Sequence, residues 1–412
     1  MRLLWLGHNL AYPPKGGVLQ RNYNLLRQAA KTGEVHVVAF DQPASRQPVI
    51  SREDCVSELR KFCSTVEVFE LPRARARASQ YLLALRALLS PRPYDVEWLS
   101  SAALAVRLRT LSTLRRFDVI HVDTIGLAPY VGCFPGVPIV LNHHNVESVM
   151  MERRAALERD SLKRVYFRRE VAKLAAAETY WCEQFDLNTV VSEEEGTHLS
   201  NHCPNARWRV VANGVDVEYF SPVTGPCGAK LLFCGGLTWY PNQDAMRFFF
   251  ADVWPLLIRN VPEVEMCVIG RSPPAWLQRI ARDDSRVRVT GFVDDVRPFF
   301  GNATVYVCPI RDGGGTRLKI LDALAMGLPL VATRFACSGI DVKEGEHVLF
   351  AETPEEFVLQ IRRVLDDAAL WRALSTAGRI LIEQHYSWDT IGRELQGAYE
   401  AAIGHRAKRL PR

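Results

Sequence analysis

Apolar runs of strand length alternate with amphipathic stretches of helical length along the chain. Near the beginning, the apolar run LLWLG is followed by a helical pattern from about Val18 to Lys31 and then by the apolar run VHVVAF. Two buried strands joined by a helix form a βαβ unit, and repetition of this unit predicts a parallel sheet with helices on both faces. The pattern starts again at KLLFCGG, so the periodicity predicts an α/β protein with two doubly wound sheets.

The boundary between the two sheets is expected within residues 221–230, where the segment SPVTGPCGAK combines prolines and glycines. We therefore predict an amino-terminal domain over residues 1–222, a second domain over residues 223–387 and a terminal segment over residues 388–412. A chain of 412 residues suffices for two domains of roughly 200 residues, each able to bury its own core. The basic end, HRAKRLPR, is expected to be frayed.

The most informative stretch is CPIRDGGGTRLKILDALAMGLPLVATRFA, from Cys308 to Ala336. A buried strand is expected to end in a glycine turn, and a helix follows at once. The turn and the helix start combine six residues suited to an anion, namely Gly313, Gly314, Gly315, Thr316, Arg317 and Lys319. Glycines let backbone amides approach a ligand closely, and the positive end of the helix dipole lies beside them. With the carboxylate of Asp322 one turn further on, the pattern predicts a site for a diphosphate and a ribose.

This stretch also admits purely structural roles. A glycine turn between a strand and a helix can serve packing alone, and Asp322 three residues after Lys319 can form a surface ion pair. The contiguous glycines match neither the P-loop pattern nor the dinucleotide pattern G-x-G-x-x-G, so the phosphate site would belong to a different class.

Composition excludes several functions and changes the expected location. The formal net charge is +5, a mild excess that suits small anions or a membrane surface, and no nucleic-acid-binding signature is present. The ten cysteines include no C-x-x-C pair and are expected to be reduced core residues. The apolar start ends early at Gly7, and no apolar run approaches the length of a transmembrane helix. We expect a cytoplasmic protein that is peripheral at the inner face of the cell membrane or free of it.

Two strand ends in the first half carry candidate ligand-binding groups. The loop AYPPKGG places Gly16 and Gly17 after the first strand, where ligands of open α/β sheets bind, although the loop could equally be only a turn. The strand VPIVLN ends in His143 and His144, which cannot both point the same way on an extended chain. These histidines with Glu147 could suggest a metal, but adjacent histidines lack the spacing of a helical zinc pair. His121, inside the strand FDVIHVD, is expected to be packed.

Two cationic segments could lie on an anionic membrane surface. The first begins at Arg73 and contains RARARASQYLLALRALL, and the second is expected to be one long helix from about Ser148 to Gln184. Its cations are Arg153, Arg154, Lys163, Arg164, Arg168 and Arg169. The alternative is a solvated helix face packed on the sheet, which charge runs usually represent.

From Pro309 to Ala323 the chain resembles the donor-site signature of family 4 glycosyltransferases, in the subgroup written P-x-x-x-G-G-G-T-R-L-K-I-L-E-A. The N-G-V-D segment before the expected boundary and the frame V-x-x-H-N at the histidines are also similar to the family. This resemblance implies the GT-B fold, two Rossmann-like domains facing a central cleft, with a terminal helix crossing back to the first domain. It also implies a retaining enzyme.

The resemblance further assigns roles to residues of this chain. It implies that Gly313 to Thr316, Arg317 and Lys319 bind the donor diphosphate together with Gly16 and Gly17, and that Asp322 binds the ribose. His144 would address the donor sugar as the catalytic residue, and backbone groups near Gly291 and Phe292 would face the nucleobase.

Two departures from the family pattern concern the donor site. Gly314 and Asp322 stand where the family has the two glutamates of its E-x7-E motif, and Gly236 and Asn242 stand where many members have an Arg and a Lys. The second exchange implies that cations from Arg317 and Lys319 take over.

The expected activity is transfer of a sugar from a nucleoside-diphosphate sugar to an acceptor hydroxyl, with a glycan or lipid-linked acceptor in polysaccharide or glycolipid assembly. No D-x-D motif is evident, so neither a metal nor a cofactor is expected to be required. Two alternatives remain, a GT-B epimerase that acts on a nucleotide sugar without an acceptor, and a catalytically degenerate nucleotide-sugar-binding subunit.

Overall fold

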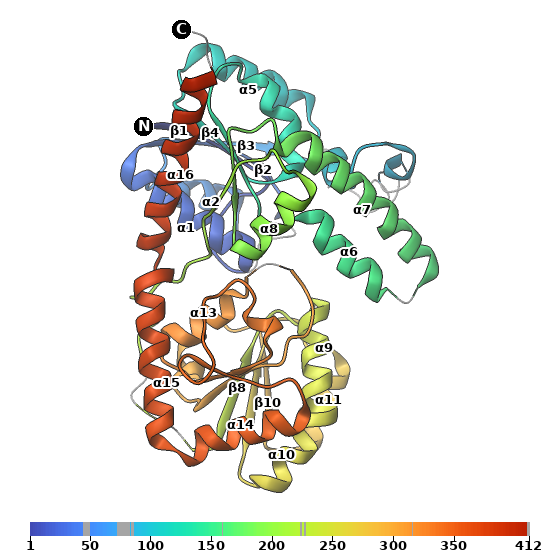
Figure 1. The fold of residues 1–412 in the computed structure, drawn as a ribbon, viewed down its shortest axis with the longest axis vertical. Helices are drawn as coiled ribbons and strands as arrows, with labels where there is room; N and C mark the ends of the chain where they lie inside the picture. The colour runs from blue at the N-terminus through green and yellow to red at the C-terminus, as the bar shows by residue number, and fades with distance from the viewer. Residues whose placement is uncertain are drawn as a thin grey trace. The chain divides into compact units, whose positions relative to one another are not determined.

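The computed structural model of the chain contains two compact units, which we describe separately. It describes residues 1–43, 50–71, 83, 86–158, 160–222, 225, 228–314 and 316–409. Unit 1 comprises Met1–Ala212 and Ile391–Arg412, and unit 2 comprises Asn213–Thr390. Each unit is an α/β layer structure, as the hydrophobic periodicity predicts (Figure 1).

Unit 1 contains, within its described residues, a parallel sheet of seven strands in the order β3-β2-β1-β4-β5-β6-β7. The strands are β1 (Arg2–Gly7), β2 (Glu34–Asp41), β3 (Thr65–Glu70), β4 (Val119–Val122), β5 (Ile139–Asn142), β6 (Leu187–Val190) and β7 (Trp208–Val210). β1 and β4 are buried over nearly their whole length, because a parallel strand covered by helices on both faces is continuously apolar. These strands confirm the runs expected from the sequence.

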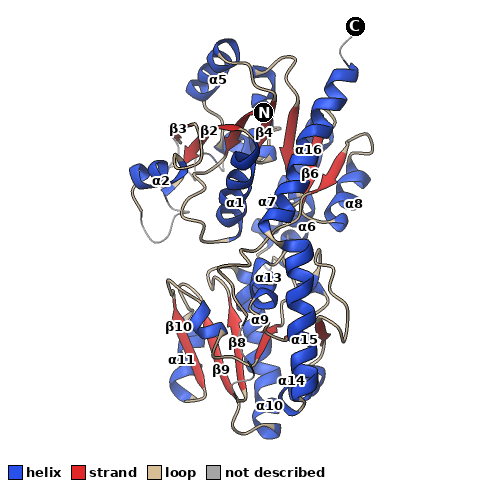
Figure 2. Ribbon diagram, turned by 90° about the vertical axis from the view of Figure 1, so that its left-hand side faces the viewer, coloured by secondary structure: helices blue, strands red, loops and turns tan. Residues whose placement is uncertain are grey.

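Helices cover both faces of the unit 1 sheet (Figure 2). They are α1 (Gly17–Thr32), α2 (Arg52–Leu59), α4 (Tyr94–Trp98), α5 (Ala102–Leu114), α6 (Glu147–Leu157), α7 (Ser161–Cys182), α8 (Glu193–His202) and the later part of α16 (Trp388–Arg409). Leu4 and Leu6 of β1 pack with α5 and α8 in one core. On the opposite face, Tyr399 of α16 hydrogen-bonds His121 of β4.

The single long helix expected from Ser148 to Gln184 is wrong, because the structure has two helices that pack against each other, α6 and α7. The break lies at Asp160, whose side chain accepts hydrogen bonds from the backbone N–H groups of Leu162 and Lys163. This cap satisfies amides that a continuous helix would pair internally, so α7 begins afresh at Ser161.

Unit 2 contains, over the part of it that is described, a parallel sheet of six strands in the order β10-β9-β8-β11-β12-β13. The strands are β8 (Lys230–Cys234), β9 (Glu265–Ile269), β10 (Val287–Gly291), β11 (Val305–Cys308), β12 (Leu330–Ala332) and β13 (Val348–Phe350). The helices include α9 (Tyr240–Phe248), α10 (Trp254–Asn260), α11 (Ala275–Asp283), α13 (Leu318–Ala325), α14 (Pro354–Asp366) and α15 (Ala368–Leu381). In both sheets the first and fourth strands are neighbours, as in doubly wound folds.

The chain changes from unit 1 to unit 2 between Ala212 and Asn213, earlier than the expected boundary at 222 and 223. Contacts with later parts of unit 2 explain where the intervening segment belongs. The guanidinium of Arg379 donates to the carbonyls of Val217 and Phe220, at 2.8 and 2.6 Å. These bonds and the packing of Gly214 against Trp388 attach the segment to unit 2.

The basic carboxyl end is more ordered than the expected frayed tail. Helix α16 continues to Arg409, and residues 410–412 lie outside the described residues. Arg406 lies 3.8 Å from the carboxylate of Asp186, which ties this end of the helix to unit 1. The expectation of fraying is therefore wrong for residues 405–409.

Two properties of the chain bear on its surroundings. Over the described residues, no helix combines the length and hydrophobicity needed to cross a bilayer. The nine cysteines that the structure describes form no disulfide with one another and are mostly buried, as the sequence predicts.

Candidate functional site

Polar residues of unit 1 converge where β1, β4 and β5 end, next to the point at which the strand order reverses. At their centre, the fully buried Asp123 follows β4. Its Oδ2 lies 2.5 Å from His8 Nδ1, and its Oδ1 lies 3.0 Å from His144 Nε2. Asn22 donates to the same carboxylate at 2.6 Å. Ligands of open α/β sheets bind at such a switch point, so this cluster is a candidate site.

The charged groups of this cluster shift one another's pKa values. Burial raises the pKa of the Asp123 carboxyl, but the imidazoles of His8 and His144 outweigh burial and hold that pKa well below its ordinary value. Burial lowers the pKa of His8, yet Asp123 outweighs it and raises the pKa overall. Burial lowers the pKa of His144 more than Asp123 raises it. Asp123 is therefore ionised and His8 is its favoured cationic partner.

The two adjacent histidines have different surroundings. His144 faces Asp123, whereas His143 is buried and lies 3.1 Å from Asn188 Oδ1 and 3.8 Å from Cys182 Sγ. Burial lowers the pKa of His143 to about 4, so it is neutral. Of the two, only His144 belongs to the polar cluster.

The sequence patterns did not single out His8 or Asp123. His121 is packed as expected, since it is fully buried and stacks on Trp5 at 3.6 Å between ring centroids. Both overlooked residues follow directly on a buried strand, and that position was a usable signal. What the sequence does not show is that β1 lies beside β4.

The nitrogen and oxygen atoms of His8, Asp123 and His144 lie within 4.8 Å of one another, a spacing that a metal ion could also use. Here each imidazole contacts a carboxylate oxygen directly, and Asn22 contacts it too. These direct contacts join the three residues and Asn22 in a hydrogen-bonded network.

Gly16 and Gly17 are exposed at the start of α1, in the same unit. Gly16 has φ of 101°, a backbone conformation that residues with a Cβ rarely adopt. Among the described residues no side chain caps this helix start, so side chains leave its first N–H groups unsatisfied.

In unit 2, the glycine turn follows β11 and is held by the start of α9. Gly313 has φ of 122° and is buried, and a Cβ on it would lie 3.2 Å from the indole of Trp239. Tyr240 donates a hydrogen bond to the carboxylate of Asp312. Gly314 lies in the same turn, whereas Gly315 lies outside the described residues. The turn therefore requires glycine at 313 for both its conformation and its contact with α9.

The amine of Lys319 reaches the turn after β8. Its Nζ donates to Asn242 Oδ1 at 2.6 Å and lies 4.8 Å from the centre of the Phe233 ring. Asn242 in turn donates to the carbonyl of Gly236 at 2.8 Å. A Cβ on Gly235 would lie 2.4 Å from Nζ, so glycine there leaves the space that the amine occupies. Burial lowers the pKa of Lys319.

The two residues that precede α13, Thr316 and Arg317, both have buried polar groups. Arg317 is buried and its guanidinium lies 4.5 Å from the centre of the Phe335 ring, so its charge lies within the protein near the start of α13. The hydroxyl of Thr316 is buried without a hydrogen-bond partner among the described residues. A buried hydroxyl without a partner is uncommon and is consistent with a ligand contact at the turn.

Asp322 does not form the surface ion pair that its spacing from Lys319 allows. Within the described residues no ion pair joins the two side chains, and Oδ1 of Asp322 is buried without a hydrogen bond. Burial raises the pKa of Asp322 to about 7, and the Lys319 amine offsets this effect only in part.

This raised pKa predicts a pH dependence of stability. Because the folded protein binds the proton more tightly than the unfolded chain, the free energy of unfolding should decrease as pH rises from about 4 to about 7. Asp322→Asn removes this contribution, so its stability relative to wild type should increase by about 4 kcal/mol over that range. Urea denaturation at a series of pH values measures the difference. A difference that does not change with pH would show an ordinary, solvated carboxyl.

Gly291 ends β10 with φ of 75°, and Phe292 beside it is 45% exposed. The N–H of Gly270 donates to the carbonyl of Gly291 at 3.1 Å, so this turn is tied to the end of β9. Both residues thus lie at the same edge of the unit 2 sheet as the glycine turn.

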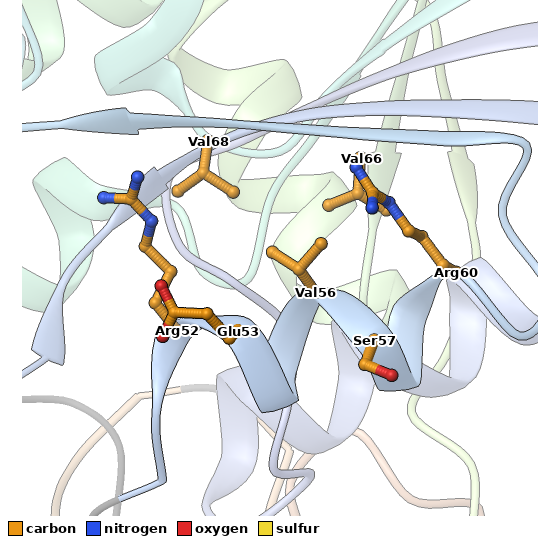
Figure 3. Close-up of a pocket in the computed structure, with 7 residues that line it drawn as sticks. All are labelled: Arg52, Glu53, Val56, Ser57, Arg60, Val66 and Val68. Atoms are coloured by element: carbon orange, nitrogen blue, oxygen red, sulfur yellow. The ribbon is translucent and has the colours of Figure 1, made fainter.

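A separate hollow in unit 1 lies between α2 and β3 (Figure 3). It is lined by Arg52, Glu53, Val56, Ser57, Arg60, Val66 and Val68. Arg52 pairs with Glu70 at 3.4 Å. None of the residues predicted from the sequence lines this hollow, so it is not the predicted site.

Two family models match the chain. The model described as Glycosyltransferase Family 4 matches residues 15–219, and the model described as Glycosyl transferases group 1 matches residues 228–367. Together they span most of both units.

Curated relatives share low identity. A 44.6 kDa protein of the cps region of Klebsiella pneumoniae is 20% identical over 235 residues, which cover 54% of this chain and 58% of that protein. Glycogen synthase of Mycobacterium tuberculosis is 26% identical over 326 residues, 74% of each protein. The chain thus spans somewhat more than half of the first relative's length.

Solved structures show the same fold over nearly the whole chain. Sucrose-phosphate synthase from Thermosynechococcus elongatus has a TM-score of 0.69 at 15% identity, covering 98% of this chain and all of that one. HepE of Anabaena, solved with UDP-glucose, has a TM-score of 0.66 at 15% identity, with 97% and 100% coverage. The predicted two-sheet fold is confirmed.

Proposed function

The chain belongs to the family 4, group 1 glycosyltransferases, and on that premise we propose that it transfers a sugar from a nucleoside-diphosphate sugar to an acceptor hydroxyl with retention of configuration. The observation that carries the donor assignment is the partly buried amine of Lys319, held by Asn242 beside the glycine turn of unit 2. A cation at the carboxyl edge of a doubly wound sheet, next to a glycine turn, suits a diphosphate.

Negative charge develops on the leaving diphosphate during the reaction, and fixed positive groups of the proposed site stabilise it. In this proposal Lys319, the amides of Gly313 to Thr316 and the start of α13 contact the diphosphate, and the buried Arg317 adds positive charge near the start of α13. The family pattern also assigns Gly16 and Gly17 of unit 1 to the donor diphosphate. These groups supply the needed charge, so the proposal requires no metal and no cofactor.

The remaining assignments follow the family pattern. Asp322 accepts hydrogen bonds from the ribose, the turn at Gly291 and Phe292 faces the nucleobase, and His144 contacts the donor sugar. HepE has been solved with UDP and with UDP-glucose, which supports a nucleotide-sugar donor. The Klebsiella relative in the cps region supports a role in polysaccharide or glycolipid assembly, with a glycan or lipid-linked acceptor.

A panel of labelled nucleotide sugars, incubated with the protein and with lipid extracts, tests this function. Transfer of label to an acceptor is the expected result, and the matching nucleoside diphosphate should raise the melting temperature. Isomerised free donor would indicate an epimerase, an alternative that the comparisons do not support. Binding without turnover would indicate a degenerate subunit.

We also propose that unit 1 binds an anionic membrane surface from the cytoplasmic side, through the tip of the α6–α7 hairpin. Three apolar side chains there are exposed, Leu157 by 55%, Leu162 by 82% and Val165 by 66%. Cations lie among and beside them, namely Lys163, Arg164, Arg168 and Arg169. Exposed aliphatic groups among cations suit the boundary of an anionic bilayer. The arginines from Arg73 to Arg77, the other part of the surface expected from the sequence, lie outside the described residues.

The hairpin tip predicts salt-sensitive membrane binding. The protein should sediment with phosphatidylglycerol vesicles at low salt and be released at high salt, because screening acts over about 10 Å at 0.1 M. Lys163→Glu with Arg164→Glu should weaken sedimentation about tenfold or more, since each cation near such a surface contributes about 1 kcal/mol. Arg362→Glu, on the exposed face of α14, is the matched control. Equal binding to phosphatidylcholine and phosphatidylglycerol vesicles would refute electrostatic binding to the membrane. Binding to neither kind of vesicle would also refute it.

A further inference from the structure

His8 and Asp123 form a pair with the geometry of a catalytic dyad. His8 Nδ1 lies 2.5 Å from Asp123 Oδ2, across 115 residues of sequence. Asp123 is fully buried, whereas the side chain of His8 keeps 20% of its surface exposed. A buried carboxylate that holds one imidazole nitrogen orients the ring and strengthens the other nitrogen as a base.

The hydrogen bonds of Asp123 determine which nitrogen of His8 carries the proton. The carboxylate can only accept, so Nδ1 of His8 must be the N–H that faces it. Asn22 donates to the same oxygen at 2.6 Å and limits rotation of the carboxylate. In neutral His8 the lone pair is therefore on Nε2. Among the described residues none hydrogen-bonds Nε2, so it is available to a substrate.

The surroundings of His8 suit a group that gains and loses a proton. The charged groups that interact with it are Asp123 after β4, Asp95 of α4 and His144 after β5. The two carboxylates favour the protonated ring and His144 opposes it. His144 shares the carboxylate of Asp123 but is only 9% exposed, so it is the less accessible of the two imidazoles.

We propose that His8 is a catalytic base that accepts the proton of the acceptor hydroxyl, with Asp123 as its positioning residue. The proposal rests on the function proposed above and adds the acceptor side of the reaction. The acceptor oxygen forms a bond with the anomeric carbon on the same face that the diphosphate leaves, which retains the configuration, and its proton moves to His8 Nε2. The bond from the anomeric carbon to the diphosphate oxygen breaks, and its electron pair leaves with the diphosphate. His8 then releases the proton to solvent.

Comparing two nucleophiles distinguishes a catalytic base from a residue that only positions the substrate. Water must lose a proton when it attacks the donor sugar, whereas the azide anion carries none. Both are offered with the labelled nucleoside-diphosphate sugar that the wild-type protein consumes, and release of the nucleoside diphosphate is measured. His8→Gln should slow the reaction with water by about 100-fold or more and leave the reaction with azide within about threefold of wild type. His198→Gln, on α8, is the matched histidine control and should change neither rate.

The pH profile provides an independent readout. In wild type the rate with water should rise with pH as His8 loses its proton, and the rate with azide should not show this rise. His8→Gln should remove the rise. Asp123→Asn should lower the rate with water as well, because an amide at this position weakens the base.

Several results would overturn the proposal. An equal loss with water and azide would make His8 a structural or donor-side residue, and an unchanged rate with water would exclude it from the reaction. A stoichiometric metal ion retained by wild type and lost in His8→Gln would make the cluster a metal site. If wild type consumes none of the nucleotide sugars, the proposed function fails, which is a different result from a failure of His8.

Discussion

Lys319→Ala should weaken binding of a nucleoside diphosphate by about 10- to 100-fold while leaving the affinity for the free nucleoside nearly unchanged. The amine is held in place by Asn242 Oδ1 at 2.6 Å and by the face of Phe233. A hydrogen bond between two charged groups contributes about 1.5 to 3 kcal/mol, and alanine removes it without an alternative cation in the same space. The expected loss of affinity therefore depends on the phosphates of the ligand and not on its base or ribose.

Calorimetric titration with the nucleoside and with its diphosphate measures this contrast. Lys343→Ala is a suitable control, because Lys343 is an exposed lysine of unit 2 that pairs only loosely with Glu346, at 3.7 Å. Asn242→Ala should give a smaller loss, since the amine remains but is no longer held. An unchanged diphosphate affinity in Lys319→Ala would mean that the amine is structural and that another group binds the phosphates.

His144→Ala should lower turnover by about 100-fold or more with little change in nucleoside diphosphate affinity. The side chain lies at the carboxyl end of β5, and Asp123 fixes its ring through a 3.0 Å contact with Nε2. A fixed imidazole of this kind can stabilise a sugar during transfer, and a residue that acts mainly in the transition state affects kcat more than binding. Steady-state turnover with the donor found in the panel, together with diphosphate titration, separates the two quantities.

The adjacent histidine is the natural control for this experiment. His143 is buried against Asn188 and Cys182, so His143→Ala should cost about 1 to 3 kcal/mol of stability and reduce turnover less than His144→Ala. If the two effects are reversed, His143 is the residue that addresses the sugar and the family alignment of this strand end is shifted by one.

Local patterns were sufficient for most of the secondary structure. Strands such as β1 and β11 were predictable because a buried parallel strand is an uninterrupted apolar run, and α1 because its apolar positions recur at helical spacing. The α6–α7 break was missed because charge and periodicity continue across it, while the stop depends on one cap at Asp160 and on packing between the two helices.

The candidate donor site was also largely local, since the glycine turn, Lys319 and Asp322 lie within ten residues of one another. The residues that surround them come from distant parts of the sequence. The bond from Lys319 to Asn242 spans 77 residues and depends on β8 lying beside β11. The raised pKa of Asp322 depends on burial in the folded unit, and for that reason the sequence around it could not predict it.

By itself the sequence determined the fold class, the two sheets, the family and the glycine turn, because apolar periodicity and backbone freedom are encoded within a few residues. Only the tertiary structure decided that His8 and His144 share the carboxylate of Asp123. The parallel order β1-β4-β5 places three strand ends side by side, and that order arises from which strands pair across long stretches of chain. Pairing of this kind depends on packing of the whole sheet with its helices, so no local sequence pattern predicts it.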